Sequence, residues 1–115
     1  MFIANAFSLQ MLATDATVSI ETVDIETAQA IAVSAESAIG HADTAAVVSD
    51  LLGTNLAANR VNVNLNKGDQ LLVAQVMGGR LPEGATTLPD GMKIAFKLVT
   101  VRTEKEEQLF RNLNN

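Results

Sequence analysis

Hydrophobic and polar positions alternate with different periods along the first part of this 115-residue chain, and these periods predict two strands followed by a helix. Residues 2–6 form a short apolar run, and residues 17–23 alternate polar and apolar side chains over β-branched positions, so each segment is typical of a strand. Residues 25–35 are rich in alanine and follow Asp24, a residue type that commonly caps helices, so we expect a helix there.

The next segment predicts a strand end, a tight turn and a second helix. Residues 37–41 carry apolar side chains up to a glycine, which is typical of a strand that leads into a turn. Residues 44–52 place apolar side chains at helical spacing. We expect Asp43 to be the N-cap of this helix and Gly53 to lie just past its last residue.

The most regular alternation in the chain predicts a β-hairpin. In residues 60–65, valine and leucine alternate with asparagine, and residues 66–69 read Asn-Lys-Gly-Asp, a turn sequence. Residues 70–77 then form a strongly apolar run, which completes the expected hairpin. Residues 78–84 contain three glycines and one proline and are expected to form a loop.

The C-terminal part of the chain predicts one more strand, over residues 92–103, and a charged helix or tail over residues 104–112. The length of the chain fits one domain. We therefore expect a single α/β domain at residues 1–103, built from a mixed β-sheet with helices packed against it, and a charged C-terminal segment at residues 104–115. The pattern does not give the order of the strands.

Composition and charge narrow the function classes. The chain has no cysteine, which excludes disulfides and thiolate chemistry, and no apolar run approaches the length of about 20 residues that a membrane span needs. We expect a cytoplasmic protein that does not bind membranes. All eight basic residues follow Asn59, and the formal net charge is −5, which argues against binding to long DNA or RNA. A compact anionic ligand remains compatible, because a few arginines and helix N-terminal amides can hold phosphates.

His41 is the only histidine, and it directly precedes the second predicted helix. Imidazole can donate or accept a proton near neutral pH, and loops at strand ends often carry functional residues. A lone histidine at a helix start can equally have no chemical task. The position of His41 therefore makes it a candidate without deciding its role.

Arg80 and Glu83 lie three residues apart in the glycine-rich loop. A guanidinium fork suits a phosphate or a pentacovalent transition state, and the carboxylate can orient it, but an exposed ion pair is the simpler interpretation. Asn5 and Ser8 flank the end of the first strand and can bind either a nucleotide or the local backbone. One histidine and no cysteine make a zinc site improbable, and no phosphate-binding glycine motif is present. We expect no metal and no cofactor.

Three segments resemble a family of small proteins from archaeal viruses, phages and mobile elements that includes the type III anti-CRISPR ring nucleases. They read Ala-Asn-Ala-Phe-Ser-Leu-Gln-Met-Leu at residues 4–12, Ser-Ala-Ile-Gly-His-Ala-Asp-Thr-Ala at residues 37–45, and Arg-Leu-Pro-Glu-Gly at residues 80–84. The likeness runs from about residue 1 to about residue 100, in the same order and at similar spacing. No single segment is diagnostic, and the combination carries the resemblance.

The resemblance implies a compact α/β homodimer that binds cyclic tetra-adenylate, the second messenger of type III CRISPR complexes, across its two-fold axis. The catalytic roles of such an enzyme would fall on His41, Arg80 and Glu83. The ligand contacts that we expect beside them are Asn5, Ser8, Ile39 and Gly40. This chain has Asp43 where some relatives have serine, and a carboxylate there can cap the helix but is a poor neighbour for a phosphate.

The expected function is therefore a metal-independent phosphodiesterase that cleaves cyclic tetra-adenylate to linear di-adenylate with 2′,3′-cyclic phosphate ends. Two alternatives belong to other classes. The same fold can sequester a cyclic nucleotide without cutting it, or the protein can be a structural or regulatory component of a mobile element.

Overall fold

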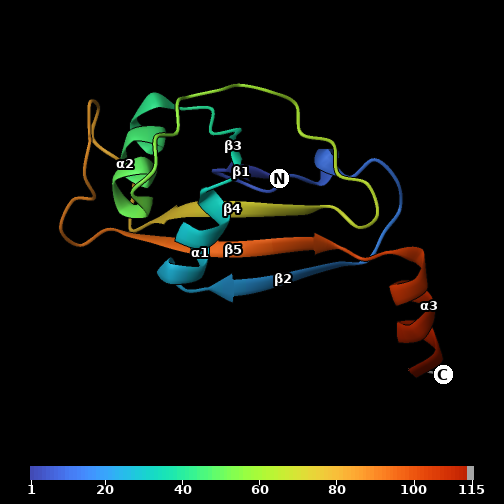
Figure 1. Cartoon of the computed structure of the whole chain (residues 1–115). Coiled ribbons are helices and arrows are strands. Elements are labelled where there is room, and N and C mark those ends of the chain that lie inside the picture. Colours follow the sequence, from blue (N-terminus) through green and yellow to red (C-terminus); the bar gives the residue numbers. More distant parts are fainter. Residues whose placement is uncertain (114–115) are drawn as a thin grey trace.

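The computed structural model describes residues 1–113, which form a mixed β-sheet with helices on one face and at one end (Figure 1). In chain order the elements are β1 (Phe2–Ala4), a short 3₁₀ helix η1 (Leu9–Met11), β2 (Val18–Val23), α1 (Ile25–Ala32), β3 (Glu36–Ser37), α2 (Ala42–Leu52), β4 (Gln70–Met77), β5 (Lys93–Val101) and α3 (Glu104–Leu113). The expected single-domain α/β fold with a mixed sheet is confirmed. The predicted C-terminal segment 104–115 begins as a helix, and its last two residues lie outside the described residues.

The five strands are ordered β2-β5-β4-β1-β3. β1 pairs in parallel with both β3 and β4, whereas β5 pairs antiparallel with β4 and β2. Because β1, β3 and β4 are parallel, the segments that follow their carboxyl ends begin at the same edge of the sheet. This arrangement decides where the candidate site forms.

α1 and α2 cover one face of the sheet and form the larger part of the core (Figure 1). Their apolar stripes follow from helical spacing, because Ala28 and Ala32 in α1, and Ala45, Val48 and Leu52 in α2, recur every three or four residues and are buried. They pack against buried side chains of the sheet and of the loop after β3, which include Ile3, Ile39, Leu72, Ala74 and Phe96. Small alanines on both helices allow them to approach the sheet closely.

Residues 60–65 correct the hairpin prediction. They form no strand, and a single bridge joins Leu65 to Leu12. Both edges of β4 are already occupied, one by β1 and the other by β5, so no edge remains for a further strand. Val63 and Leu65 instead lie over the second face of the sheet and are buried there, while Asn62 and Asn64 are exposed. The alternation of apolar and polar residues therefore results from packing of this segment on a face of the sheet and not from pairing with a strand. The hairpin that exists joins β4 to β5 through residues 78–92.

The predicted helix boundaries are close to those observed, with one wrong cap. α1 begins after Asp24, whose carboxylate accepts a hydrogen bond from the amide of Thr27 at 2.8 Å, but α1 ends at Ala32 and not at residue 35. α2 ends at Leu52, and Gly53 follows it as expected, in a left-handed conformation with φ +64°. The prediction that Asp43 caps α2 is wrong, because His41 occupies the N-cap position and Asp43 lies inside the first turn. None of the helices within residues 1–113 is long and apolar enough to cross a membrane.

Candidate functional site

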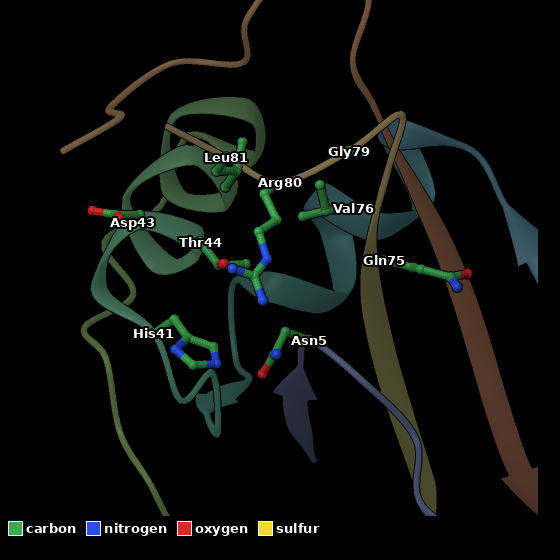
Figure 2. A pocket seen from close by; sticks show the side chains of 9 residues that line it. All are labelled: Asn5, His41, Asp43, Thr44, Gln75, Val76, Gly79, Arg80 and Leu81. Carbon is green, nitrogen blue, oxygen red and sulfur yellow. The ribbon is translucent and has the colours of Figure 1, made fainter. Parts of the chain in front are cut away.

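The candidate site lies where the three parallel strands end. Asn5 follows β1, His41 follows β3 after a short loop, and Arg80 lies three residues beyond the end of β4. These segments enclose an open pocket of about 500 Å³, which falls within the size range of small-molecule sites (Figure 2). The residues that line it are Asn5, His41, Asp43, Thr44, Gln75, Val76, Gly79, Arg80 and Leu81. The topology thus brings together residues that are far apart in the sequence.

His41 is exposed at the N-cap of α2 and faces the pocket (Figure 2). Its backbone is extended, with φ −126° and ψ 132°, and its side chain makes no capping hydrogen bond. The first amides of α2 therefore lack a side-chain acceptor from the N-cap. Amides at a helix start, together with the helix dipole, favour a negative charge nearby. An imidazole and a weakly positive helix end thus meet at the same place.

Three side chains fix the loop that carries His41. Asn5 accepts a hydrogen bond from the amide of Gly40 at 3.3 Å, and the Arg60 side chain donates to the carbonyl of Gly40 at 2.9 Å. The side-chain amide of Asn59 donates to the carbonyl of Ser37 at 2.8 Å. Since these bonds come from segments before and after the loop, the position of His41 depends on contacts across the whole domain.

Arg80 reaches the pocket from the loop after β4. Gly78 and Gly79 precede it with φ values of +95° and +128°, which residues with a Cβ rarely adopt. These two glycines form a turn that changes the direction of the chain at the end of β4. Figure 2 shows the guanidinium of Arg80 pointing into the space bounded by His41, Thr44 and Asn5. None of the ion pairs within residues 1–113 involves Arg80, so its donors are available to an anionic ligand.

Asp43 joins the two halves of the site. It lies two residues after His41, and its carboxylate accepts a hydrogen bond from the amide of Gly84 at 3.1 Å. In Figure 2 the Asp43 carboxylate points away from the Arg80 guanidinium, toward the outer side of α2. The bond to the loop therefore directs the charge of Asp43 away from the centre of the pocket.

The structure does not bring every predicted site residue to the pocket. Glu83 is exposed in the same loop as Arg80, but it is not among the lining residues, and no ion pair within residues 1–113 joins the two. Ser8 caps η1 through the amide of Gln10 and lines a separate hollow. Ile39 is fully buried in the core, and the amide of Gly40 is bound to Asn5.

Among the lining residues that were not predicted from the sequence, two are polar, Thr44 and Gln75. Thr44 is buried, and its hydroxyl makes no hydrogen bond to another group in the described part of the chain. It lies in the first turn of α2, three residues after the extended N-cap His41, and its residue type alone does not mark it as a pocket residue. Gln75 lies on β4, and nothing in the sequence distinguishes it from an ordinary exposed strand residue. Thr44 brings a hydroxyl to the pocket, whereas the side-chain amide of Gln75 points away from Arg80 and His41 in Figure 2.

The pocket combines the Arg80 guanidinium, the His41 imidazole, an uncapped helix start and the neutral side chains of Asn5 and Thr44, and the carboxylate of Asp43 at its edge is turned outward. This set of groups suits an anion that also carries hydroxyl or amide groups. Within residues 1–113, no three side chains of His, Asp or Glu lie together in a way that could hold a metal ion. The chemistry that the arrangement can offer is charge stabilisation by Arg80 and proton transfer by His41.

Comparison with known proteins agrees with this architecture. The family model described as STIV B116-like matches residues 1–106. Among solved structures, the chain is similar to B116 of Sulfolobus turreted icosahedral virus, with 35% sequence identity and a TM-score of 0.69 over 86% of this chain and 97% of that one. No curated protein matches the sequence. The chain therefore belongs to the STIV B116-like family, and the viral protein B116 has a similar fold.

Proposed function

We propose that this protein is a metal-independent phosphodiesterase that opens cyclic tetra-adenylate and so counteracts type III CRISPR immunity. The observation that carries the proposal is the meeting of His41 and Arg80 in one open pocket, although 38 residues separate them in the sequence. Resemblance of the segments around these two residues to ring nucleases supports the choice of substrate. The lack of cysteine and of a second histidine supports a mechanism that uses no zinc.

The ligand supplies its own nucleophile in this mechanism. The ribose 2′-oxygen attacks the adjacent phosphorus, a new bond from the 2′-oxygen to phosphorus forms, and the bond from phosphorus to the 5′-oxygen breaks. The products are a 2′,3′-cyclic phosphate and a 5′-hydroxyl. The main task of the pocket is to hold these three atoms in line, which by itself supplies a large part of the rate enhancement in such reactions.

His41 and Arg80 then have separate tasks. Arg80 and the first amides of α2 stabilise the negative charge on the equatorial phosphate oxygens. Protonated His41 gives its proton to the departing 5′-oxygen, a role that is worth about 10²–10⁴ in rate. The proton of the 2′-hydroxyl passes to water, which the open pocket admits. Glu83 orients the 2′-hydroxyl or the Arg80 guanidinium once the ring is bound.

A homodimer accounts for the size and symmetry of the ligand. A ring of four identical nucleotides contains a two-fold axis, as does an isologous dimer. We propose that each protomer holds half of the ring and presents one His41 to one of two opposite phosphodiesters. Two cuts then give two molecules of linear di-adenylate.

Turnover in excess chelator tests the proposal. The protein is incubated with cyclic tri-, tetra- and hexa-adenylate in EDTA, and the products are separated by chromatography. We expect linear di-adenylate from the tetramer, and a loss of about 10²–10⁴ in rate for His41→Ala with binding of the ring retained. Arg80→Ala should lose both rate and affinity, whereas Arg111→Ala, which removes an exposed arginine of α3 remote from the pocket, should leave both unchanged.

Other outcomes point to other functions. A tight complex from which the intact ring is recovered would identify a sequestering protein and refute the catalytic mechanism. Lack of affinity for any cyclic oligoadenylate would favour a structural or regulatory role in a virus or mobile element. Normal cleavage by His41→Ala, or complete inhibition by EDTA, would refute the proposed chemistry.

A further inference from the structure

The loop that carries Arg80 is attached to the rest of the domain by very few polar contacts. The amide of Ala85 donates a hydrogen bond to the carbonyl of Pro82, and the amide of Met92 donates one to the carbonyl of Pro89. Both bonds are local to the loop. Among the described residues, the only hydrogen bond from this loop to another element is the one from the amide of Gly84 to the carboxylate of Asp43, at 3.1 Å. We call this contact the Asp43–Gly84 tether.

Apolar packing holds the far half of the loop. Leu88 and Met92 are half-buried beside Ile25 and Leu51, close to the point where β5 begins. In the near half, the residues that flank Arg80 are Gly79, which is exposed, and Leu81, which is half-buried at the pocket. Among the described residues, the tether is thus the one hydrogen bond that fixes the near half relative to α2.

The tether acts close to Arg80. Arg80 lies between the two glycines at positions 78 and 79, which have positive φ, and Gly84, whose amide is fixed. At the other end of the bond, Asp43 is only two residues after His41 in the first turn of α2. One hydrogen bond thus links the segment that bears the guanidinium to the helix start that bears the imidazole.

We propose that Asp43 is a positioning residue, which holds the Arg80 loop against the start of α2 and thereby sets the placement of the guanidinium relative to His41. This inference rests on the proposed function for its catalytic consequence, but the tether itself can be tested without any ligand. It also gives a reason for an acidic side chain beside a pocket for anions: the carboxylate bonds to a loop amide outside the pocket.

Two other effects of Asp43 must be separated from the tether. Its negative charge repels a bound phosphate, and the same charge stabilises the start of α2 through the helix dipole. Asp43→Asn and Asp43→Ala both remove the charge, but only asparagine keeps an oxygen that can accept the Gly84 amide. Alanine has the higher helix propensity of the two, so a defect seen only in Asp43→Ala cannot come from a weakened helix.

The first measurement uses the ligand-free protein. Amide exchange of Gly84 is followed by NMR in the wild type, Asp43→Asn and Asp43→Ala. Loss of one exposed hydrogen bond should speed exchange of the Gly84 amide in Asp43→Ala by about two- to tenfold, and Asp43→Asn should restore most of the protection. Asp50→Asn and Asp50→Ala are matched controls, because Asp50 is an exposed acid of the same helix, and they should leave Gly84 unchanged.

The second measurement is turnover of cyclic tetra-adenylate. A misplaced guanidinium weakens stabilisation of the transition state, so kcat should fall by about two- to tenfold in Asp43→Ala. Asp43→Asn should keep a kcat near that of the wild type. The lost charge lowers KM equally in both variants, and an effect of charge alone would leave their kcat values equal.

Three results would overturn the inference: equal Gly84 exchange in all three proteins, equal kinetic defects in the Asn and Ala variants, or faster Gly84 exchange in Asp43→Ala with an unchanged kcat. If the wild type cleaves no cyclic oligoadenylate, the proposed function fails. The placement of Arg80 is then read from the NMR resonance of its Nε–H group, which should shift in Asp43→Ala and not in Asp43→Asn, and an unshifted resonance would refute the inference.

Discussion

The two glycines that lead from β4 to Arg80 offer a sharp test of how this loop is built. Gly78 has φ +95° and Gly79 has φ +128°, so an alanine at either position must adopt a conformation that residues with a Cβ rarely take. The surroundings differ, because a Cβ on Gly78 would lie 3.0 Å from the carbonyl oxygen of Gly91, whereas a Cβ on Gly79 would meet nothing within 4 Å. Gly40 serves as the control, since its φ is not in the positive region and a Cβ there would make an ordinary 3.5 Å contact with Arg60.

These contacts set the expected changes in the free energy of unfolding. The positive φ destabilises the alanine variant by about 1–3 kcal/mol at each position. The lower conformational entropy of its unfolded chain stabilises it by about 0.4–1 kcal/mol, which offsets part of this loss. Gly79→Ala should therefore destabilise the protein by about 1–2 kcal/mol. Gly78→Ala should lose about 1–3 kcal/mol more, because the carbonyl of Gly91 is backbone and cannot move aside freely. Gly40→Ala should change the stability by less than about 1 kcal/mol.

Urea unfolding followed by far-UV circular dichroism measures this series, since the chain has no Trp or Tyr for fluorescence. All variants are compared at one protein concentration, so that any association affects them equally. In thermal scans, each kcal/mol corresponds to about 4 °C in Tm for a chain of this size. The reasoning is refuted if Gly78→Ala is as stable as Gly79→Ala, or if Gly40→Ala loses as much stability as either.

Three further predictions use the same assay. Leu72→Ala should cost about 2–5 kcal/mol, because this fully buried side chain of β4 lies in the core under the helices. Asn59→Ala should cost about 0.5–1.5 kcal/mol, since it removes the bond that holds the carbonyl of Ser37; an unchanged urea midpoint would contradict this. The amide of Thr17 and then the ammonium of Lys67 hold the pKa of the buried Glu107 below its ordinary value of 4.5. The stability that this lowered pKa contributes is present above pH 4.5 and is lost as the pH falls through the lowered value, so the urea midpoint of the wild type should fall more on acidification than that of Glu107→Gln. Equal falls would refute the role of Glu107.

Most elements of the fold could be predicted from local pattern. The β-branched alternation at residues 17–23 became β2, and the capping carboxylate of Asp24 marked the start of α1 to the residue. Gly53 ended α2 as expected, in a left-handed conformation. These signals are local, because they depend on backbone preferences and on contacts between residues that are near in sequence.

The wrong predictions concern contacts between distant segments. Residues 60–65 have the period of a strand, but β1 and β5 already pair with both edges of β4, so the segment packs on a sheet face. Asp43 has the residue type of an N-cap, but α2 begins before it, at Ala42, and its carboxylate accepts a hydrogen bond from the distant amide of Gly84. In both cases the observed contact is with a segment far away in the sequence, which the local preference does not specify.

The candidate site shows the same division. Residue type and loop position drew attention to His41 and Arg80, and the pocket brings both together. Thr44 and Gln75 were missed because an ordinary helix residue and an ordinary strand residue become pocket residues only through their neighbours in space. Glu83 shares the loop of Arg80, yet a separation of three residues in a loop does not fix a common direction for two side chains.

By itself the sequence determined the fold class, most strands and helices, and the residue types available for chemistry, because these depend on composition and on short-range periodicity. Only the tertiary structure decided the strand order β2-β5-β4-β1-β3, which places the ends of three parallel strands at one edge and builds a pocket there. It also decided that Asp43 ties the Arg80 loop to α2. The physical reason is that strand order and such tethers depend on which distant surfaces bury each other best, and the local period of a segment is the same whichever partner it finds.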